Sequence, residues 1–236
     1  MPDGGPPRGL GRRVVVLDTE TTGLDPAAGH RVVEVACIEL VNLMPTGREL
    51  HFYCDPERDM PPEAEEIHGL TAEFLSRHEK FGHHAPGFQA FMAGADALVA
   101  HNAPFDVAFL NAELTRHGQP ILACEAIDTL QLARRKFPGG PASLDALCRR
   151  FGIDTSERTK HGALIDTRLL ARVYLELMGG QQPDLNLAAA AIAASAIAGA
   201  VPPAIRPARR YSLSEAERAA HAAMLSELKN PLWLAD

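Results

Sequence analysis

The pattern of hydrophobic and polar positions along the chain predicts strands first and helices later. Short apolar, β-branched runs bounded by turn residues are typical of strands, and the first three form a meander with a hairpin loop at 42–47. Strands are expected at 13–18, 31–40, 49–54, 96–100 and 124–128. Apolar residues at helical spacing predict helices at 104–117, 143–151, 162–178 and 211–229.

The order of these elements indicates the fold class. Three meander strands followed by helix–strand–helix units predict an α/β fold in which helices flank a mixed five-stranded sheet. In the helix expected at 104–117, Pro104 suits the first turn, and Ala108, Leu110 and Leu114 are core candidates.

Composition divides the chain into four parts. Residues 1–12 are rich in Pro and Gly, lack the apolar segment of a signal peptide, and are expected to form a flexible N-terminal extension. A compact domain is expected at 13–180, a flexible linker rich in Ala and Pro at 181–210, and a helical C-terminal tail at 211–236. We do not expect the apolar run within the linker to cross a membrane, because alanine dominates it and Ser, Gly and Pro interrupt it.

Charge and cysteine content narrow the classes of function. The chain has 236 residues and a net charge of −7, whereas a protein that binds nucleic acid through its own positive surface is usually basic. Either nucleic acid is not the partner, or bound cations reverse the field at an acidic site. The four cysteines form no C-x-x-C pair, which argues against a zinc or redox motif and favours a reducing, cytoplasmic setting.

Asp18 and Glu20 lie at the end of the first predicted strand, two residues apart. Strand side chains alternate, so both carboxylates point to one face, where they repel each other. A divalent cation would remove that cost, and hard oxygen ligands favour magnesium or manganese over zinc. The pair alone also fits an ordinary polar strand end.

Three further residues favour the metal interpretation. Asp106 falls in the first turn of a helix just after a buried strand, where an acid can also simply balance the helix dipole. Asp166 lies in the apolar stripe of the helix at 162–178, an unusual place for an unpaired charge. His161 precedes Asp166 by five residues, so both share one site only if His161 lies in the incoming loop.

These residues resemble a known family. The strings VVVLDTETTG, HNAPFD and HGALID are similar to the three motifs of the DEDDh 3′→5′ exonucleases. The family's four acids and histidine match Asp18, Glu20, Asp106, Asp166 and His161. The resemblance implies a ribonuclease H-like exonuclease fold, two divalent metal ions (Mg²⁺ or Mn²⁺) and phosphodiester hydrolysis.

The same resemblance implies a role for each residue. Asp18, Glu20 and Asp166 would hold the metal that binds the nucleophilic water, and Asp18 and Asp106 would hold the second metal. His161 would take the proton of the water as general base, because its unperturbed pKa near 6.5 suits that task.

The likeness extends to the proofreading epsilon subunits of bacterial DNA polymerase III, from residue 13 to about 187. PEAEEIHGLT resembles the segment of those subunits that contacts the terminal nucleotide. The implied substrate is a DNA 3′ end, single-stranded or frayed, from which a mispaired nucleotide is removed. The implied substrate-binding residues are Asp18, Glu20, Glu63, His68 and Asp166. Glu63 also fits a helix N-terminal acid, and His68 a surface turn.

Two segments after the domain resemble docking elements. Gln182, Leu185 and Leu187 form a Q-x-x-L-x-L pattern, similar to peptides that bind the bacterial sliding clamp, although ordinary linker also fits it. The tail resembles the segment of epsilon that binds the polymerase III alpha (catalytic) subunit.

In that tail Ser214 and Glu217 have the spacing of a capping box. Leu232, Trp233 and Leu234 would form a terminal apolar anchor, although the helix could instead fold back on its own domain. A small theta-like subunit is a further partner that the resemblance allows.

Two other functions stay open at this point. One is a stand-alone DEDDh exonuclease of DNA repair or RNA processing, which would need neither clamp peptide nor anchor. The other is a catalytically silent scaffold that links polymerase and clamp. The complete set of acids with His161 argues against the scaffold, because a scaffold has no need of a repulsive acid cluster.

Overall fold

The computed structural model describes residues 12–156, 158, 160–179 and 214–227. These residues fall into two units, a domain that ends near Gly179 and a separate C-terminal helix. Each unit is described by itself.

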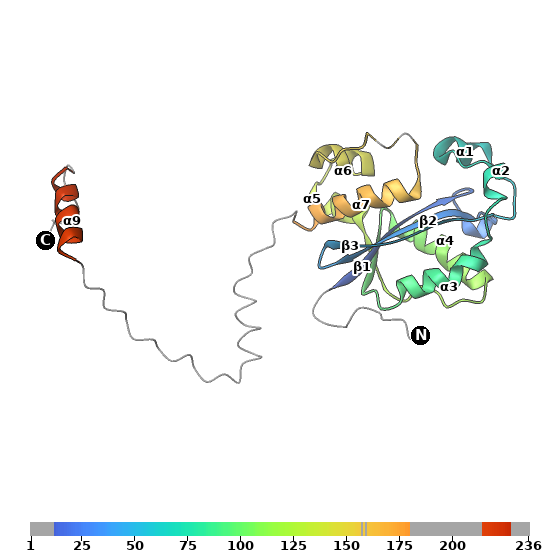
Figure 1. Ribbon diagram of the computed structural model, residues 1–236. Coiled ribbons are helices and arrows are strands. Elements are labelled where there is room, and N and C mark those ends of the chain that lie inside the picture. The colour runs from blue at the N-terminus through green and yellow to red at the C-terminus, as the bar shows by residue number, and fades with distance from the viewer. Residues whose placement is uncertain (1–11, 157, 159, 180–213, 228–236) are drawn as a thin grey trace, which may run out of the picture. The chain divides into compact units, whose positions relative to one another are not determined.

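A mixed five-stranded sheet forms the centre of the domain (Figure 1). Its strands are β1 (Arg13–Thr21), β2 (Val32–Val41), β3 (Met44–Tyr53), β4 (Ala97–Ala100) and β5 (Glu125–Asp128). The order is β3-β2-β1-β4-β5, with β1, β2 and β3 antiparallel and with β4 parallel to both β1 and β5. The predicted fold class is therefore confirmed.

Helices cover both faces of the sheet (Figure 1). They are η1 (Pro26–Ala28, a 3-10 helix), α1 (Pro62–His68), α2 (Ala72–Leu75), α3 (Phe81–Met92), α4 (Ala103–Arg116), α5 (Thr129–Lys136), α6 (Leu144–Phe151) and α7 (Ala163–Leu177). Side chains alternate along β1, so Val15 and Leu17 pack against α3 and α4, while Val14 and Val16 pack against α7. Helices α5 and α6 pack in turn on α7.

The hairpin between β2 and β3 is tighter than the sequence predicts. The expected loop at 42–47 contains only Asn42 and Leu43 between the two strands, both with positive φ, as in a two-residue hairpin turn. Pro45 and Gly47, which favoured a loop, belong to β3 instead. An edge strand tolerates proline because one of its sides has no strand to bond.

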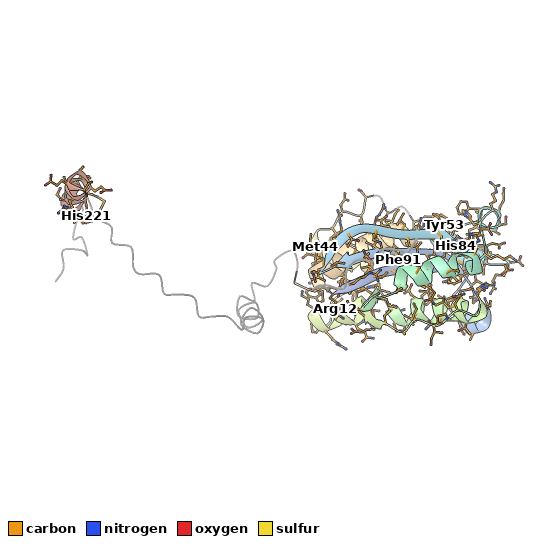
Figure 2. The ribbon with its side chains drawn as sticks, turned by 60° about the horizontal axis from the view of Figure 1, so that its bottom comes forward. Arg12, Met44, Tyr53, His84, Phe91 and His221 are labelled. Carbon is orange, nitrogen blue, oxygen red and sulfur yellow. The ribbon has the colours of Figure 1, made fainter. Side chains whose placement is uncertain are left out.

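Helix α3 was not predicted, because Pro86 and two glycines interrupt its helical pattern. It packs beside β3, where the ring of His84 stacks on that of Phe52 at 4.4 Å and Phe91 lies further along the same helix (Figure 2). In α4 the prediction for Ala108 was wrong, since it is exposed, whereas Leu110 and Leu114 are buried as expected.

The C-terminal unit contains α9 (Glu215–Glu227). Its capping box is present: the backbone N–H of Ser214 donates to Glu217 Oε2 at 2.8 Å, and the backbone N–H of Glu217 donates to Ser214 Oγ at 3.3 Å. Its side chains, His221 among them, are largely exposed (Figure 2). The clamp-like peptide 182–187 and the anchor 232–234 lie outside the described residues. No helix that the structure describes is long and apolar enough to span a membrane.

Candidate active site

The predicted catalytic residues converge at the edge of the sheet where β1 and β4 end. The parallel register pairs Val14–Val16 with Ala97–Val99, so β4 delivers the chain into α4 beside the last residues of β1. Asp18 and Glu20 lie on β1 beyond this pairing, and Asp106 lies in the first turn of α4. Ligands of α/β sheets bind at such an edge, outside the carboxyl ends of parallel strands.

The start of α7 brings His161 and Asp166 to the same edge. His161 stands in the loop just before the helix, whose N-cap is Gly162, so the condition set by its spacing from Asp166 is met. Its Nδ1 lies 3.2 Å from Asp166 Oδ2. Potential ligand atoms of Glu20, His161 and Asp166 all lie within 4.8 Å of one another.

Asp18 and Glu20 show the electrostatic cost of this arrangement. Burial and then the charges of Asp106 and Glu20 raise the pKa of Asp18 well above its ordinary value. Burial and then Glu34 and Asp166 raise the pKa of Glu20 to about 8. Without further positive charge, Glu20 therefore holds a proton near neutral pH.

Asp106 completes the group from the other side of β1. Burial raises its pKa to about 7, although a hydrogen bond from the Thr19 hydroxyl to Asp106 Oδ1, 2.8 Å long, acts in the opposite direction. Because side chains alternate along β1, Thr19 reaches Asp106 while its neighbours Asp18 and Glu20 face α7. The end of β1 thus contacts acids on both sides of the sheet.

Glu34 on β2 is a residue that the sequence analysis did not single out. It pairs with Glu20 across the β1–β2 ladder and is buried. Its Oε1 lies 2.7 Å from His51 Nε2, and its Oε2 accepts the backbone N–H of Ala163 at 3.1 Å. Glu34 therefore ties the first residue of α7, two positions after His161, to the sheet. The signal for Glu34 in the sequence was an acid within the apolar run VVEVACIEL.

Arg158 was also missed, since nothing in its local sequence marks it. Its side chain is 9% exposed. Nε donates to Asp166 Oδ1 at 2.5 Å and Nη2 donates to Asp166 Oδ2 at 2.7 Å, while Nη2 lies 2.8 Å from His161 Nδ1. Nη1 pairs with Asp145 at the start of α6.

Glu63 and His68 line a cavity of ≈ 500 Å³ beside the acids. Glu20 and Phe105 line the same cavity, together with the loop after β1. His68 is buried, and its Nδ1 accepts the backbone N–H of Leu70 at 3.0 Å, so the ring proton is on Nε2. That Nε2–H is buried and makes no hydrogen bond of standard geometry to the residues that the structure describes.

The donor set fits a divalent metal ion. Four carboxylates and one imidazole meet at one edge, and oxygen donors dominate, which suits a hard cation. The raised pKa values of Asp18, Glu20 and Asp106 express burial first and, for Asp18 and Glu20, repulsion by the neighbouring acids, and bound cations would offset both costs.

Comparisons with known proteins agree with this geometry. The family model described as Exonuclease matches residues 15–174. Among solved structures, Exonuclease X in complex with 5′ overhanging duplex DNA has a TM-score of 0.54 at 25% identity, over 70% of this chain and 90% of that one. Exonuclease I of Escherichia coli, in complex with a dA16 oligonucleotide, shares the fold with a TM-score of 0.62 at 21% identity, over 73% of this chain and 42% of that one.

Curated relatives are more similar in sequence. The DNA polymerase III subunit epsilon of Rickettsia conorii is 53% identical over 179 residues, which cover 74% of this chain and 77% of the relative. The subunit of the same name from Escherichia coli is 44% identical over 177 residues, 72% of each chain. The chain therefore belongs to the exonuclease family and, within it, to the DNA polymerase III epsilon subunits.

Proposed function

We propose that this metal-dependent 3′→5′ exonuclease acts in the cytoplasm as the proofreading subunit of a replicative DNA polymerase, removing mispaired nucleotides from DNA 3′ ends. The observation that carries the proposal is the meeting of Asp18, Glu20, Asp106, Asp166 and His161 at one edge of the sheet, beside a cavity. The names of the epsilon relatives support the link to DNA polymerase III.

The acids are proposed to hold two ions, Mg²⁺ or Mn²⁺. Asp18, Glu20 and Asp166 would hold one and Asp18 and Asp106 the other, so that Asp18 serves both. When bound, such a pair supplies an activated water and stabilises the leaving oxygen of the phosphodiester.

His161 is proposed as the general base. When Nδ1–H donates to Asp166 Oδ2, the carboxylate orients the ring and leaves Nε2 free to accept a proton from water. The ring is exposed at the site, so water reaches it. The tie from Glu34 to Ala163 would keep the loop that carries His161 in place.

The cavity beside the acids is proposed to hold the terminal nucleotide. Leu24, Ile67 and Phe105 give it apolar surface suited to a base or sugar. Burial lowers the pKa of His68, which keeps the ring neutral, and a rotation of the buried ring toward the cavity would let its Nε2–H donate to a nucleotide oxygen. Glu63, exposed at the rim, would contact the sugar end.

The partner contacts are proposed from the sequence alone. Leu232, Trp233 and Leu234 would dock on the alpha subunit, and Gln182, Leu185 and Leu187 on the sliding clamp. The segment between them and the domain is rich in Ala and Pro, which would tether the exonuclease near the primer end.

Exchanging His161 for Gln separates the base from the metal ligands. We expect turnover on single-stranded DNA to fall by about 10²–10⁴-fold, with partial recovery at higher pH where hydroxide is more abundant. Manganese affinity, measured by titration calorimetry, should stay near the wild-type value. Asp18→Asn should lose both turnover and metal affinity, and His83→Gln, at an exposed position on α3, should change neither. Loss of manganese binding in His161→Gln would contradict the assigned role.

The stability of the metal-free protein should depend on pH through the acids. Their folded-state pKa values lie above those of an unfolded chain, so the stability they contribute is complete below about pH 4 and is lost as the pH rises through about 8. Buried histidines such as His68, whose pKa is lowered, act in the opposite direction.

The informative quantity is therefore the Tm of Asp18→Asn minus that of wild type, both in chelator. We expect this difference to grow as the pH is raised from about 5 to about 8.5, because the substitution removes one of the repelling charges. Added Mg²⁺ should raise the Tm of wild type more at the upper end of this range. A difference that is constant or shrinks with pH would mean that the acids do not repel as the geometry indicates.

Removing the C-terminal tail should abolish polymerase binding and leave hydrolysis unchanged. A chain ending at Pro207 should hydrolyse single-stranded DNA normally, since every assigned catalytic residue lies before Gly179, but should not co-purify with the alpha subunit. Trp233→Ala alone should weaken binding by at least about thirtyfold, because buried aromatic anchors typically contribute about 2 kcal/mol or more. Ile121→Ala, at an exposed apolar position of the domain, is the matched control. Binding of alpha by the truncated chain would show that the tail is not the tether, and failure of the full chain to bind would favour a stand-alone enzyme.

A further inference from the structure

Arg158 occupies the part of the site that the proposed metal ion and the general base both need. Its guanidinium forms hydrogen bonds to both carboxylate oxygens of Asp166, at 2.5 and 2.7 Å. The side chains of Arg158 and Asp166 are 9% and 5% exposed, so the pair is shielded from solvent. A bidentate pair of this kind uses the oxygens that a metal ion would bind.

The same guanidinium competes for His161. Nη2 lies 2.8 Å from His161 Nδ1, and Asp166 Oδ2 lies 3.2 Å from that same nitrogen. A neutral ring nitrogen either accepts or donates, so Nδ1 cannot accept from Arg158 and donate to Asp166 at once. If it accepts from Arg158, the proton is on Nε2, and the nitrogen proposed to take a proton from water is not free.

Arg158 also has a second partner to which it can remain attached. Asp145, whose side chain is 53% exposed, pairs with Nη1 from the start of α6. Arg158 can therefore release Asp166 and His161 without losing every ionic contact, and its positive charge would then face the edge of the site.

We propose that Arg158 is a built-in counter-ion that closes the metal-free site and must release Asp166 and His161 before the site becomes active. This inference rests on the proposed function, since it assumes that Asp166 is a metal ligand. In the metal-free protein Arg158 offsets the repulsion among the acids and prevents His161 from acting as a base. Metal binding and the release of Arg158 are then linked, because the positive charge of the ion takes the place of the guanidinium beside Asp166.

The proposal predicts that removing Arg158 tightens metal binding. We compare full-length wild type with Arg158→Gln, Arg158→Lys and Arg168→Gln by calorimetric titration of Mn²⁺, with the Tm of each chain measured in chelator and in saturating Mn²⁺. Arg168 is the matched control, because it also carries a positive charge, two residues after Asp166 on α7, but pairs with Glu49 on β3.

Arg158→Gln should bind Mn²⁺ at least about fivefold more tightly than wild type, because the ion no longer displaces charge-assisted hydrogen bonds. Arg158→Lys, which keeps the charge but not the bidentate fork, should fall between the two. Arg168→Gln should stay within about twofold of wild type. In chelator the Tm of Arg158→Gln should be lower than that of wild type, and saturating Mn²⁺ should reduce this deficit.

The outcomes separate the inference from the proposed function. Equal or weaker Mn²⁺ binding by Arg158→Gln overturns the counter-ion role, because it would mean that Arg158 supports the ligands rather than competing with the ion. Equal tightening in Arg158→Gln and Arg168→Gln also overturns it, since general charge would then explain the effect. Absence of Mn²⁺ binding by wild type would instead count against the metal site itself.

Discussion

The burial of mutually repelling carboxylates, held together beside the end of β1, is the constraint on which the site depends. Burial raises the pKa values of Asp18, Glu20 and Asp106, and the charges of neighbouring acids raise those of Asp18 and Glu20 further. Such a group is tolerated where nearby positive charge offsets its cost, and the cations of a metal-dependent exonuclease supply that charge. This also resolves the mismatch between a net charge of −7 and a nucleic-acid substrate, because the positive charge at the site would come with the ions.

The rest of the domain holds this group against its own repulsion. The parallel pairing of β1 with β4 brings the C-terminal ends of these two strands to the same edge of the sheet. Glu34 attaches the first turn of α7 to β2. The loop after β1, which lines the cavity beside the acids, is held by Arg31, whose Nε and Nη2 donate to Glu113 of α4 at 2.5 and 2.9 Å. Buried pairs of this type are costly to break, typically by about 3–5 kcal/mol, so they fix the position of the loop.

The sequence was most informative where physical demands are local. Alternation along β1 and the carboxylates of Asp18 and Glu20 could be read directly, as could the loop position required of His161. Contacts that depend on tertiary structure could not be read. Arg158 belongs to the site only because the fold brings it to Asp166. Glu34 belongs to it only because the β1–β2 pairing places it opposite Glu20. Helix α3 was hidden for a different reason, since burial of its phenylalanines outweighs the cost of Pro86 and the glycines.

The central claim is that this acid edge removes nucleotides from a DNA 3′ end with the help of divalent metal ions. It is tested most directly by a time course on a 5′-labelled primer with a 3′ mismatch, with Mg²⁺ or with chelator, beside a paired primer and an RNA of the same length. The account predicts stepwise shortening from the 3′ end that requires Mg²⁺ and is faster for the mismatched than for the paired primer. Cleavage in chelator, internal cuts, or an intact primer in Mg²⁺ and in Mn²⁺ would contradict it.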